Sequence, residues 1–424
     1  MIKFLLKGLL RDSSRSRFPV LTVVLGSMLT VMIYSWITGI SGMMISSAAG
    51  FSAGHVKVMT RAYAKEAEQM PNDLALLKTS GLLERLRGDF PSQVWIARIR
   101  FGGLLDIPDE SGETRAQGPV AGLGIDLFSP SSPEPRILNL EKSLVRGRMA
   151  RRPGEILISE DFAHRLGIEP GQRATLIGST MDGGMAMANF SVAGTVRFGI
   201  AAVDHGAFIA DIEDIRKALD MEDAAGEILG FSSDFIYRPR EAEALTARFN
   251  ASYSRPDDEF SPEMLTFREA SGLAAELDMF DYFSTLLVFI FLTAMSIVLW
   301  NAGLMGSLRR YGEIGLRMAI GEDKSRIYRS LIAESLMIGI VGSVLGTALG
   351  LAVSYFLQIK GVNVASIFKN SAVLLPGVVR ARVTAASFYI GFIPGLLATL
   401  LGTSLSGIGI FKRQTAQLIK ELEA

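Results

Sequence analysis

Histidine and cysteine, two residue types that often act as nucleophiles, proton carriers or metal ligands, are scarce in this 424-residue chain. It has three histidines, His55, His164 and His205, and no cysteine. Disulfides, thiolate catalysis and cysteine-ligated zinc or iron–sulfur sites are therefore excluded. Asp161 precedes His164 by three residues, so one helix face would carry both as candidate metal ligands. A solvated helix surface explains the same spacing, and residues 204–206 have the composition of a turn.

No catalytic motif is present in the printed sequence. It lacks the GxxxxGK[ST] phosphate loop, the HExxH metalloprotease motif and the GxSxG nucleophile elbow. Its long apolar segments carry almost no ionisable group, which argues against an intramembrane protease; Glu334 is the acidic residue to note there. We therefore predict a non-catalytic protein that binds no cofactor or metal of its own.

Composition indicates a protein that is part membrane and part soluble. Hydrophobic residues make up 49% of the chain and its formal net charge is zero, so nothing favours nucleic acid as a partner. Four uncharged stretches, 18–54, 282–308, 335–359 and 383–411, each exceed the roughly 20 residues that a helix needs to cross a bilayer. The basic start is followed by an apolar stretch too long for a signal peptide, so we expect a signal anchor.

Basic residues predict the orientation. Clusters of Lys and Arg precede the first stretch, separate the second from the third, and follow the fourth. The positive-inside rule places these three segments, and so both termini, in the cytoplasm of a bacterial inner-membrane protein. The loop 360–382 carries four basic residues and argues the other way. Residues 2–11 have the pattern of an amphipathic helix on the inner leaflet, or of one packed on protein.

Residues 55–261 have a soluble composition with alternating strand and helix signals, which predicts an α+β extracytoplasmic domain inserted between the first two transmembrane helices. Strands are expected over 94–106, 155–158, 190–198 and 207–212. Ser159 should cap a helix that Gly167 ends, and Asn72 should cap one that runs through Leu86. The chain is expected to turn helical again from Pro262.

The predicted segments are therefore a cytoplasmic amphipathic helix (1–17), transmembrane helix 1 with its stalk (18–54), the α+β domain (55–261), a stalk with transmembrane helix 2 (262–308), a cytoplasmic coupling helix (309–326), transmembrane helix 3 (327–359), a periplasmic loop (360–382), transmembrane helix 4 (383–411) and a cytoplasmic tail (412–424). In the coupling segment, Gly321 can supply a left-handed residue that ends one helix, and Glu322 or Asp323 can cap the next.

The coupling segment resembles the signature of the MacB/FtsX/LolE-like (type VII) permeases of ABC transporters. Their pattern places an Asn in span two, then R-x-x-E-I-G-[LI]-x-R-A-x-G, then an acidic residue in span three. Here the pattern is matched by Asn301, Arg310, Glu313, Ile314, Gly315, Ala319, Gly321 and Glu334. Arg317 stands one residue early, as in the MacB-like branch, and the C-terminal segment lacks the family's prolines. Residues 54–57 resemble the lipoprotein-releasing LolC/LolE branch, and residues 153–171 resemble the family's MacB-like periplasmic core.

This resemblance implies partners that the residues alone do not. It implies a cytoplasmic ABC ATPase dimer that uses ATP and Mg, a second permease copy or a homologous permease, and mechanotransmission through the coupling helix to the outer domain. Residues assigned to ATPase coupling are Arg310, Glu313, Ile314, Gly315, Arg317 and Gly321. Lipoprotein release, with a lipoprotein or a periplasmic carrier as partner, is favoured; alternatives are MacB-like efflux of drugs or peptides and control of a cell-wall hydrolase.

Two further groups of residues are candidates for contacts in the membrane. Gly342, Gly346 and Gly350 recur at every fourth position of span three, which allows close helix packing within or between subunits. Met43, Met44, Phe280, Phe283 and Leu287 offer flexible and aromatic surface that could hold acyl chains or simply face membrane lipids.

Overall fold

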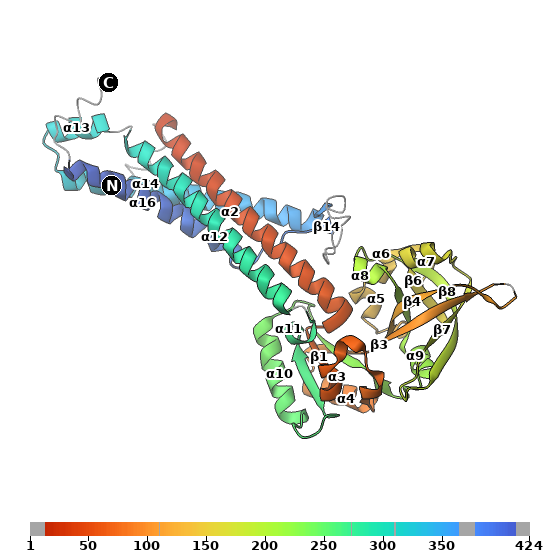
Figure 1. The fold of residues 1–424 in the computed structure, drawn as a ribbon. Coiled ribbons are helices and arrows are strands. Elements are labelled where there is room, and N and C mark those ends of the chain that lie inside the picture. Colours follow the sequence, from red (N-terminus) through yellow and green to blue (C-terminus); the bar gives the residue numbers. More distant parts are fainter. Residues whose placement is uncertain (1–12, 110, 273, 309–310, 364–377, 413–424) are drawn as a thin grey trace. The chain divides into compact units, whose positions relative to one another are not determined.

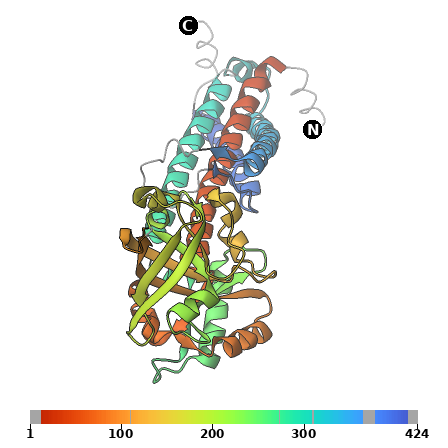
Figure 2. The same cartoon turned by 90° about the vertical axis from the view of Figure 1, so that its right-hand side faces the viewer.

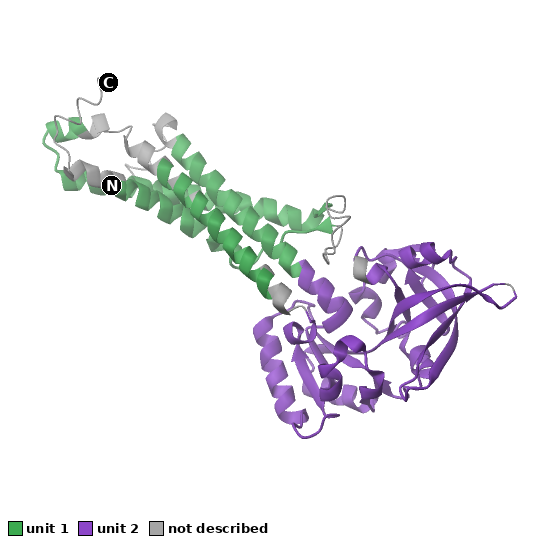
Figure 3. Ribbon diagram, viewed as in Figure 1, with its two compact units in different colours: residues 1–42, 278–363, 378–424 green, residues 43–277, 364–377 purple. Residues whose placement is uncertain are grey.

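The computed structural model describes residues 13–109, 111–272, 274–308, 311–363 and 378–412. Contacts divide the chain into two compact units (Figure 3). Unit 1 takes the described residues among 1–42, 278–363 and 378–424, and unit 2 takes those among 43–277. Helices α2 (Ser13–Ala48) and α12 (Ala274–Leu308) contribute residues to both units.

Unit 1 is helical (Figure 1). Four stretches of helix, 17–53, 281–298, 324–360 and 387–405, are by length and composition able to cross a membrane. Each overlaps one of the four uncharged segments, so the helical part of the predicted membrane protein is supported. Besides α2 and α12, unit 1 contains α13 (Tyr311–Ala319), α14 (Lys324–Lys360), β13 (Val362–Asn363), β14 (Val378–Val379), α15 (Ser387–Ile390) and α16 (Phe392–Lys412).

Two of these helices differ from their sequence-based bounds. Helix α14 begins at Lys324, well before the uncharged stretch, because the chain is extended at Asp323 and helical from the next residue. The fourth segment starts only at Ser387 and is interrupted at Gly391. Pro394 explains the interruption, because proline has no N–H to donate to the carbonyl of Ile390. The amphipathic helix expected over 2–11 lies outside the described residues.

Unit 2 contains a ten-stranded sheet with helices around it (Figure 2). Its strands are β1 (Val56–Thr60), β3 (Gln93–Pro108), β4 (Thr114–Ile125), β5 (Leu144–Gly147), β6 (Glu155–Ser159), β7 (Arg173–Ser179), β8 (Met185–Val196), β9 (Ala207–Asp211), β11 (Glu227–Ser232) and β12 (Pro262–Thr266), and β2 (Leu76–Leu77) pairs separately with β10 (Ala224–Ala225). The helices of unit 2 are α3 (Arg61–Lys65), α4 (Thr79–Asp89), α5 (Glu134–Ile137), α6 (Leu140–Ser143), α7 (Glu160–Leu166), α8 (Ala201–Asp204), α9 (Ile212–Ala218), α10 (Pro239–Tyr253) and α11 (Phe267–Ala270).

The strand pairings form a closed ring with an extension. Strand β3 pairs with β4, and the path continues through β9, β6, β8 and β7 back to β3; we call these six strands the ring. The first half of β3 pairs instead with β11, which leads to β1 and β12; we call these three strands the extension. Strand β3 of the ring therefore connects it to the extension.

Each part of unit 2 has its own apolar core. The ring encloses residues such as Phe101, Phe162 and Phe208, all buried. The extension packs against α4 and α10 through Trp95, Phe249 and their neighbours. The predicted α+β class therefore holds for unit 2.

Local signals predicted several elements of unit 2 correctly. Ser159 accepts a hydrogen bond from the amide of Phe162 and begins α7, and Gly167 ends it with a φ of +64°. Strands β3, β6, β8 and β9 overlap the four predicted strands. Asp211 caps α9 through the amide of Glu213.

Two predictions were wrong. Asn72 begins only a short 3-10 turn, and the helix starts at Thr79. The carboxylate of Asp223, distant in sequence, accepts hydrogen bonds from the amide and hydroxyl of Ser80 and so fixes that helix start. Residues 262–266 form strand β12, paired along β1, and not the start of a helical stalk. Helix α11 then begins with a capping box between Thr266 and Glu269.

Candidate coupling site and the α2–β1 junction

The coupling segment forms a helix, a tight turn and a second helix. Helix α13 ends before Gly321, whose φ of +92° lies in the region that favours glycine, and α14 follows. The guanidinium of Arg317 donates to both carboxylate oxygens of Glu322, at 2.7 and 2.9 Å, and so bridges the turn. Met318 packs against Ile327 and Leu331 of α14. The angle between the two helices is thus held by an ion pair and an apolar contact.

The residues predicted to couple to an ATPase occupy this segment in different ways. Gly315 is buried, Gly321 forms the turn, and Arg317 is bonded to Glu322. Glu313 and Ile314 belong to α13, but their side chains lie outside the described residues, as does Arg310 altogether.

Two residues that the sequence interpretation missed form the exposed apolar face of α13. The side chains of Leu316 and Ile320 are 63% and 77% exposed. They stand four residues apart and therefore share one helix face. Their spacing was visible in the sequence, but the family signature drew attention to the charged positions instead.

The predicted packing glycines of α14 lie against α2 of the same chain. A Cβ atom at Gly342 would lie 2.7 Å from the Cβ of Val23. At Gly346 it would lie 2.5 Å from the carbonyl oxygen of Val24, and at Gly350 2.9 Å from that of Met28. Any larger side chain would therefore push the two helices apart.

The residues predicted to face a substrate are divided between the two units. Met43 and Met44 are half-buried near the end of α2, in unit 2. Phe283 and Leu287, on α12 in unit 1, are 57% and 53% exposed. The side chain of Phe280 lies outside the described residues.

Helix α2 ends in a π-helical turn, Ala49–Ala53, that joins it to β1 within unit 2. Gly54 follows with a φ of +61°, where a Cβ would lie 2.8 Å from the carbonyl oxygen of Val56. We call residues 45–57 the α2–β1 junction. It contacts both parts of the sheet: Ala48, Ala49 and Ala53 pack with residues of β3 and β11, and the ring of Phe51 packs edge-on against Phe198, 4.9 Å away.

A buried ion pair holds this junction. Arg98 of β3 and Glu134 of α5 are fully buried and form two hydrogen bonds, of 2.8 and 2.6 Å. The same guanidinium donates to the carbonyl oxygen of Gly50 at 2.7 Å. Carbonyls at the end of a helix lack partners within it and carry partial negative charge. Arg98 therefore ties the end of α2 to β3 and α5 at once.

A second buried pair lies beside it. The ammonium of Lys57 donates to the carboxylate of Glu227 at 2.6 Å, and both side chains are almost fully buried. Burial lowers the pKa of Lys57, and the hydrogen bond to Glu227 acts in the opposite direction and raises it. The hydrogen bond crosses between the paired strands β1 and β11.

His55 fills the remaining corner of the junction. Its ring lies 5.3 Å from that of Phe231 and 5.7 Å from that of Tyr237, and its Nδ1 accepts a hydrogen bond from the amide of Ser232. Burial lowers its pKa to about 4, so the folded domain holds this histidine neutral. Residues 54–57, which carried the family resemblance, thus serve to join helix to sheet.

We expect the stability of unit 2 to fall between pH 6.5 and pH 4 because of His55. Its pKa is depressed on folding, so the unfolded chain binds the extra proton in this range, and the stabilisation present above pH 6.5 is lost as pH falls. From an unfolded pKa near 6.5 and a folded pKa of about 4, the loss between pH 7 and pH 5 is about 2 kcal/mol. Chemical denaturation of the full chain at both pH values measures it.

His55→Asn keeps a neutral acceptor and should flatten this part of the pH profile, whereas His164→Asn, at an exposed position, should not. Comparing the profiles of variant and parent removes the contributions of the acidic groups. A His55→Asn profile as steep as that of the parent would contradict the assignment.

The described residues form no cluster of three or more His, Asp or Glu side chains suited to a metal ion. Of the pair considered from the sequence, Asp161 instead bonds to Arg197. The guanidinium of Arg165 donates to the carbonyl oxygen of His205.

Comparison with known proteins matches residues 285–415 to the FtsX-like permease C-terminal family. Two proteins described as the lipoprotein-releasing system transmembrane protein LolC, from Xylella fastidiosa strains 9a5c and Temecula1, are 24% identical over 214 residues, 49% of this chain and 50% of theirs. The chain thus aligns with about half the length of these curated relatives. The crystal structure of the periplasmic region of MacB from Actinobacillus actinomycetemcomitans is 13% identical, with a TM-score of 0.35, over 51% of this chain and 91% of that one.

The family match covers α13, the turn at Gly321, α14 and α16, and so includes the segment on which the resemblance was based. The interpretation of the sequence signature is confirmed. Residues 285–415 are thus similar to the FtsX-like permease C-terminal family, and LolC proteins are among the relatives of this chain.

Proposed function

We propose that this protein is the permease subunit of an ABC transporter and that it couples ATP hydrolysis by a separate cytoplasmic ATPase to movements of unit 2. The observation that carries the proposal is the coupling segment: an exposed apolar face, Leu316 and Ile320, on a short helix that Arg317 and Glu322 hold at a fixed turn to α14. Such a face can dock in a groove of a partner, and the braced turn passes a push on to the membrane helix. Glu313 and Ile314 are assigned to the same contact.

Mechanotransmission requires a stiff path into the outer domain. Helix α2 is continuous from Ser13 to Ala48, and the junction after it contacts both the ring and the extension. A displacement of its end would therefore act on both parts of unit 2. The partner ATPase would supply ATP and Mg chemistry, and a second permease, identical or homologous, would complete the transporter.

The proposed orientation places both termini in the cytoplasm of a bacterial inner membrane and unit 2 in the periplasm. The basic residues of loop 360–382, which argued against it, have local roles where the structure describes them. The guanidinium of Arg380 donates to the carbonyl oxygens of Gln358 and Ile359, which caps the end of α14. Lys360 lies over the ring of Phe356. Arg380 and Lys360 therefore make contacts at the C-terminal end of α14. The proposed orientation is based on the other three clusters of basic residues.

We expect Ser131→Cys to react with a membrane-impermeant maleimide in intact spheroplasts and Ser325→Cys to remain unlabelled until the membrane is opened. Ser131 is exposed in unit 2 and Ser325 lies in the first turn of α14. The parent chain has no cysteine, so each variant has one reactive site. Labelling of Ser325→Cys alone would reverse the orientation.

Within this role we propose lipoprotein release from the inner membrane as the activity. The matched relatives are named for that process, and residues 54–57 build the junction beside the outer end of the first span. Met43, Met44, Phe280, Phe283 and Leu287 are assigned to contacts with acyl chains. Each methylene removed from water contributes about 0.8 kcal/mol, so even partial capture of the chains is favourable relative to solvent.

The test uses the full chain reconstituted with its ATPase, its partner permease and an acylated lipoprotein in proteoliposomes. We expect ATP-dependent lipoprotein release, and at least a tenfold loss with Leu316→Asp or Ile320→Asp, because a docked aspartate would bury an unpaired charge. Ile314→Asp tests the sequence-based assignment in the same assay. The control is Lys324→Asp, which lies beside the turn but outside the apolar face. Leu349→Asp is not a suitable control, because an aspartate at that position would face lipid.

Release and ATPase activity distinguish the alternatives. Normal stimulated hydrolysis by Leu316→Asp and Ile320→Asp would refute α13 as the coupling helix. A parent complex that hydrolyses ATP but releases no lipoprotein would keep the permease role and favour MacB-like efflux.

A further inference from the structure

The first half of strand β3 has a neighbouring strand on one side only. It pairs with β11 from Gln93 to Arg98, whereas β4 pairs with β3 only between Ile99 and Pro108. In an antiparallel pair, alternate residues direct their N–H and C=O groups to opposite sides. Alternate residues from 93 to 98 therefore direct these groups toward the side that β4 no longer occupies.

The reason that β4 stops is local. After Ile125, the side chain of Asp126 accepts a hydrogen bond from the amide of Ser129, and its carbonyl accepts one from the hydroxyl of Ser132. These bonds fold the chain into a turn that leaves the sheet. Next to β4, strand β9 also ends, at Asp211, where α9 begins. A gap remains where both strands would continue.

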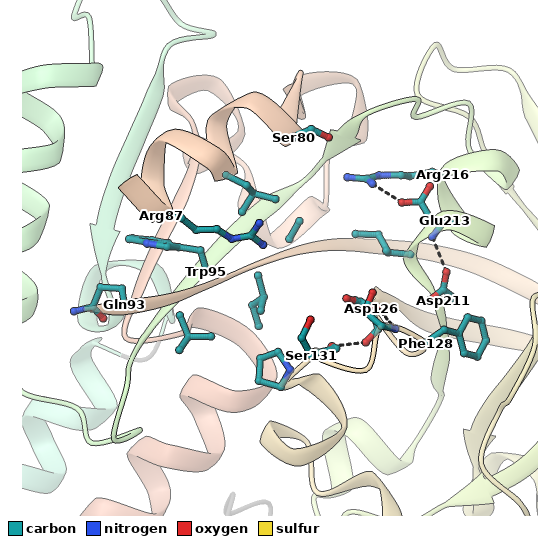
Figure 4. A pocket seen from close by; sticks show the side chains of 18 of the residues that line it. Ser80, Arg87, Gln93, Trp95, Asp126, Phe128, Ser131, Asp211, Glu213 and Arg216 are labelled. Carbon is teal, nitrogen blue, oxygen red and sulfur yellow. Dashed lines mark hydrogen bonds and ion pairs between the residues drawn. The ribbon is translucent and has the colours of Figure 1, made fainter. Parts of the chain in front are cut away.

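This gap is a cleft of about 700 Å³ (Figure 4). Five consecutive residues of β3, from Gln93 to Ala97, line it together with the loop 126–133 and residues of α4 and α9. Successive side chains of a strand point to opposite faces of a sheet. A cavity that touches all five therefore reaches the edge of the strand, where Trp95 and Ile96 are themselves only 3% and 7% exposed.

Several polar side chains around the cleft already have partners. Arg216 donates to Glu213, to Thr79 and to the carbonyl oxygen of Ala224. Asp211 accepts from the amides of Leu127 and Glu213. None of the buried side-chain atoms without a partner, among the residues that the structure describes, lines the cleft.

The backbone of β3 differs from these side chains. Between Val94 and Ala97, the described part of the chain shows no backbone hydrogen bond outside the pairing with β11. The cleft thus offers a row of main-chain groups at strand spacing, beside the side chains of Arg87, Gln93 and Ser131. The walls carry both signs of charge, with Arg87 and Arg216 against Asp126, Asp211 and Glu213, and so do not favour an anionic ligand.

We propose that this cleft binds an extended segment of a client polypeptide, which adds to the sheet as a strand along the edge of β3. Strand addition matches main-chain groups to main-chain groups, which is the complementarity that this edge offers. The edge from Gln93 to Ala97 accommodates about five residues, or about 17 Å of extended chain. This activity goes beyond transport and needs neither ATP nor the partner ATPase.

A disulfide-tethering experiment on the cysteine-free full chain in detergent tests the proposal. Ser131→Cys places one thiol at the cleft, and Thr114→Cys places one at an exposed position of β4 outside it. The probe is the peptide acetyl-VTVSVC-amide under reversible reducing conditions. Two further versions are N-methylated at odd or at even positions, so that each lacks the N–H groups of one edge.

We expect tethering of the unmodified peptide to favour Ser131→Cys over Thr114→Cys by about tenfold or more, from a few added hydrogen bonds of about 1 kcal/mol each. One methylated peptide should lose this advantage and the other keep it, since only one edge faces β3. Amide exchange at alternate residues between 94 and 97 should slow in the tethered complex. Equal tethering at both sites, or equal effects of the two methylation patterns, would overturn the proposal. Neither outcome depends on whether the chain is a transporter.

Discussion

Arg98→Met should destabilise unit 2 by about 3–5 kcal/mol, because it leaves the carboxylate of Glu134 buried without its partner. It also removes the donor that satisfies the carbonyl of Gly50 at the end of α2. The loss of stability is measured by unfolding the full chain in denaturant and using pulse proteolysis to detect the unfolding of unit 2. Arg98→Lys keeps a charge but cannot donate to both carboxylate oxygens and to Gly50 in the same geometry, so we expect an intermediate loss.

The double variant Arg98→Met, Glu134→Leu separates the charge effect from the tie to α2. With no charge left buried, unit 2 should recover most of its stability. The carbonyl of Gly50 would still lack its donor, so ATP-dependent release should remain impaired in the stable double variant. A single Arg98→Met variant as stable as the parent would show that water or another donor reaches Glu134. Lipoprotein release at the parent level by the double variant would show that the bond from Arg98 to Gly50 is not needed for coupling.

The sequence could not have revealed this ion pair. Arg98 stands in a run of apolar residues in which Arg100 is an equally good candidate, and only the register with β11 and β4 decides which one is buried. Glu134 lies within a proline-rich stretch, residues 129–135, and it is 36 positions from its partner. Pairing across such a distance depends on how the sheet closes, which no local pattern encodes.

Features with short-range causes were predictable. The four apolar helices were predictable because each uncharged stretch is long enough to cross a bilayer as a helix. The turn at Gly321 was predictable because glycine readily adopts the positive φ that the turn needs. The start of α4 was misplaced because its capping carboxylate, Asp223, comes from a distant loop. The segment proposed for coupling was identified from its signature, whereas the exposure of Leu316 and Ile320 depends on which face of α13 packs on α14.

Glycine spacing on α14 was also evident from the sequence, but its partner was not. The structure places Gly342, Gly346 and Gly350 against α2 of the same chain, so the close approach holds the first and third apolar helices together. At Gly346 the contact includes the backbone of α2, which cannot move aside as a flexible side chain can. Among these three glycines, the largest effect of a substitution is therefore expected at this position.

Gly346→Ala should lower the stability of unit 1 by an amount at the upper end of about 1–3 kcal/mol, and Gly346→Leu by more, because the added atoms overpack the contact with Val24 and Ser27. Ala348→Leu is the matched control: Ala348 lies on the same helix but is exposed, so its effect should stay within about 0.5 kcal/mol. Thermal unfolding of the detergent-solubilised chain compares the three variants. If Gly346→Leu unfolds at the same temperature as Ala348→Leu, then α2 and α14 do not pack closely through Gly346.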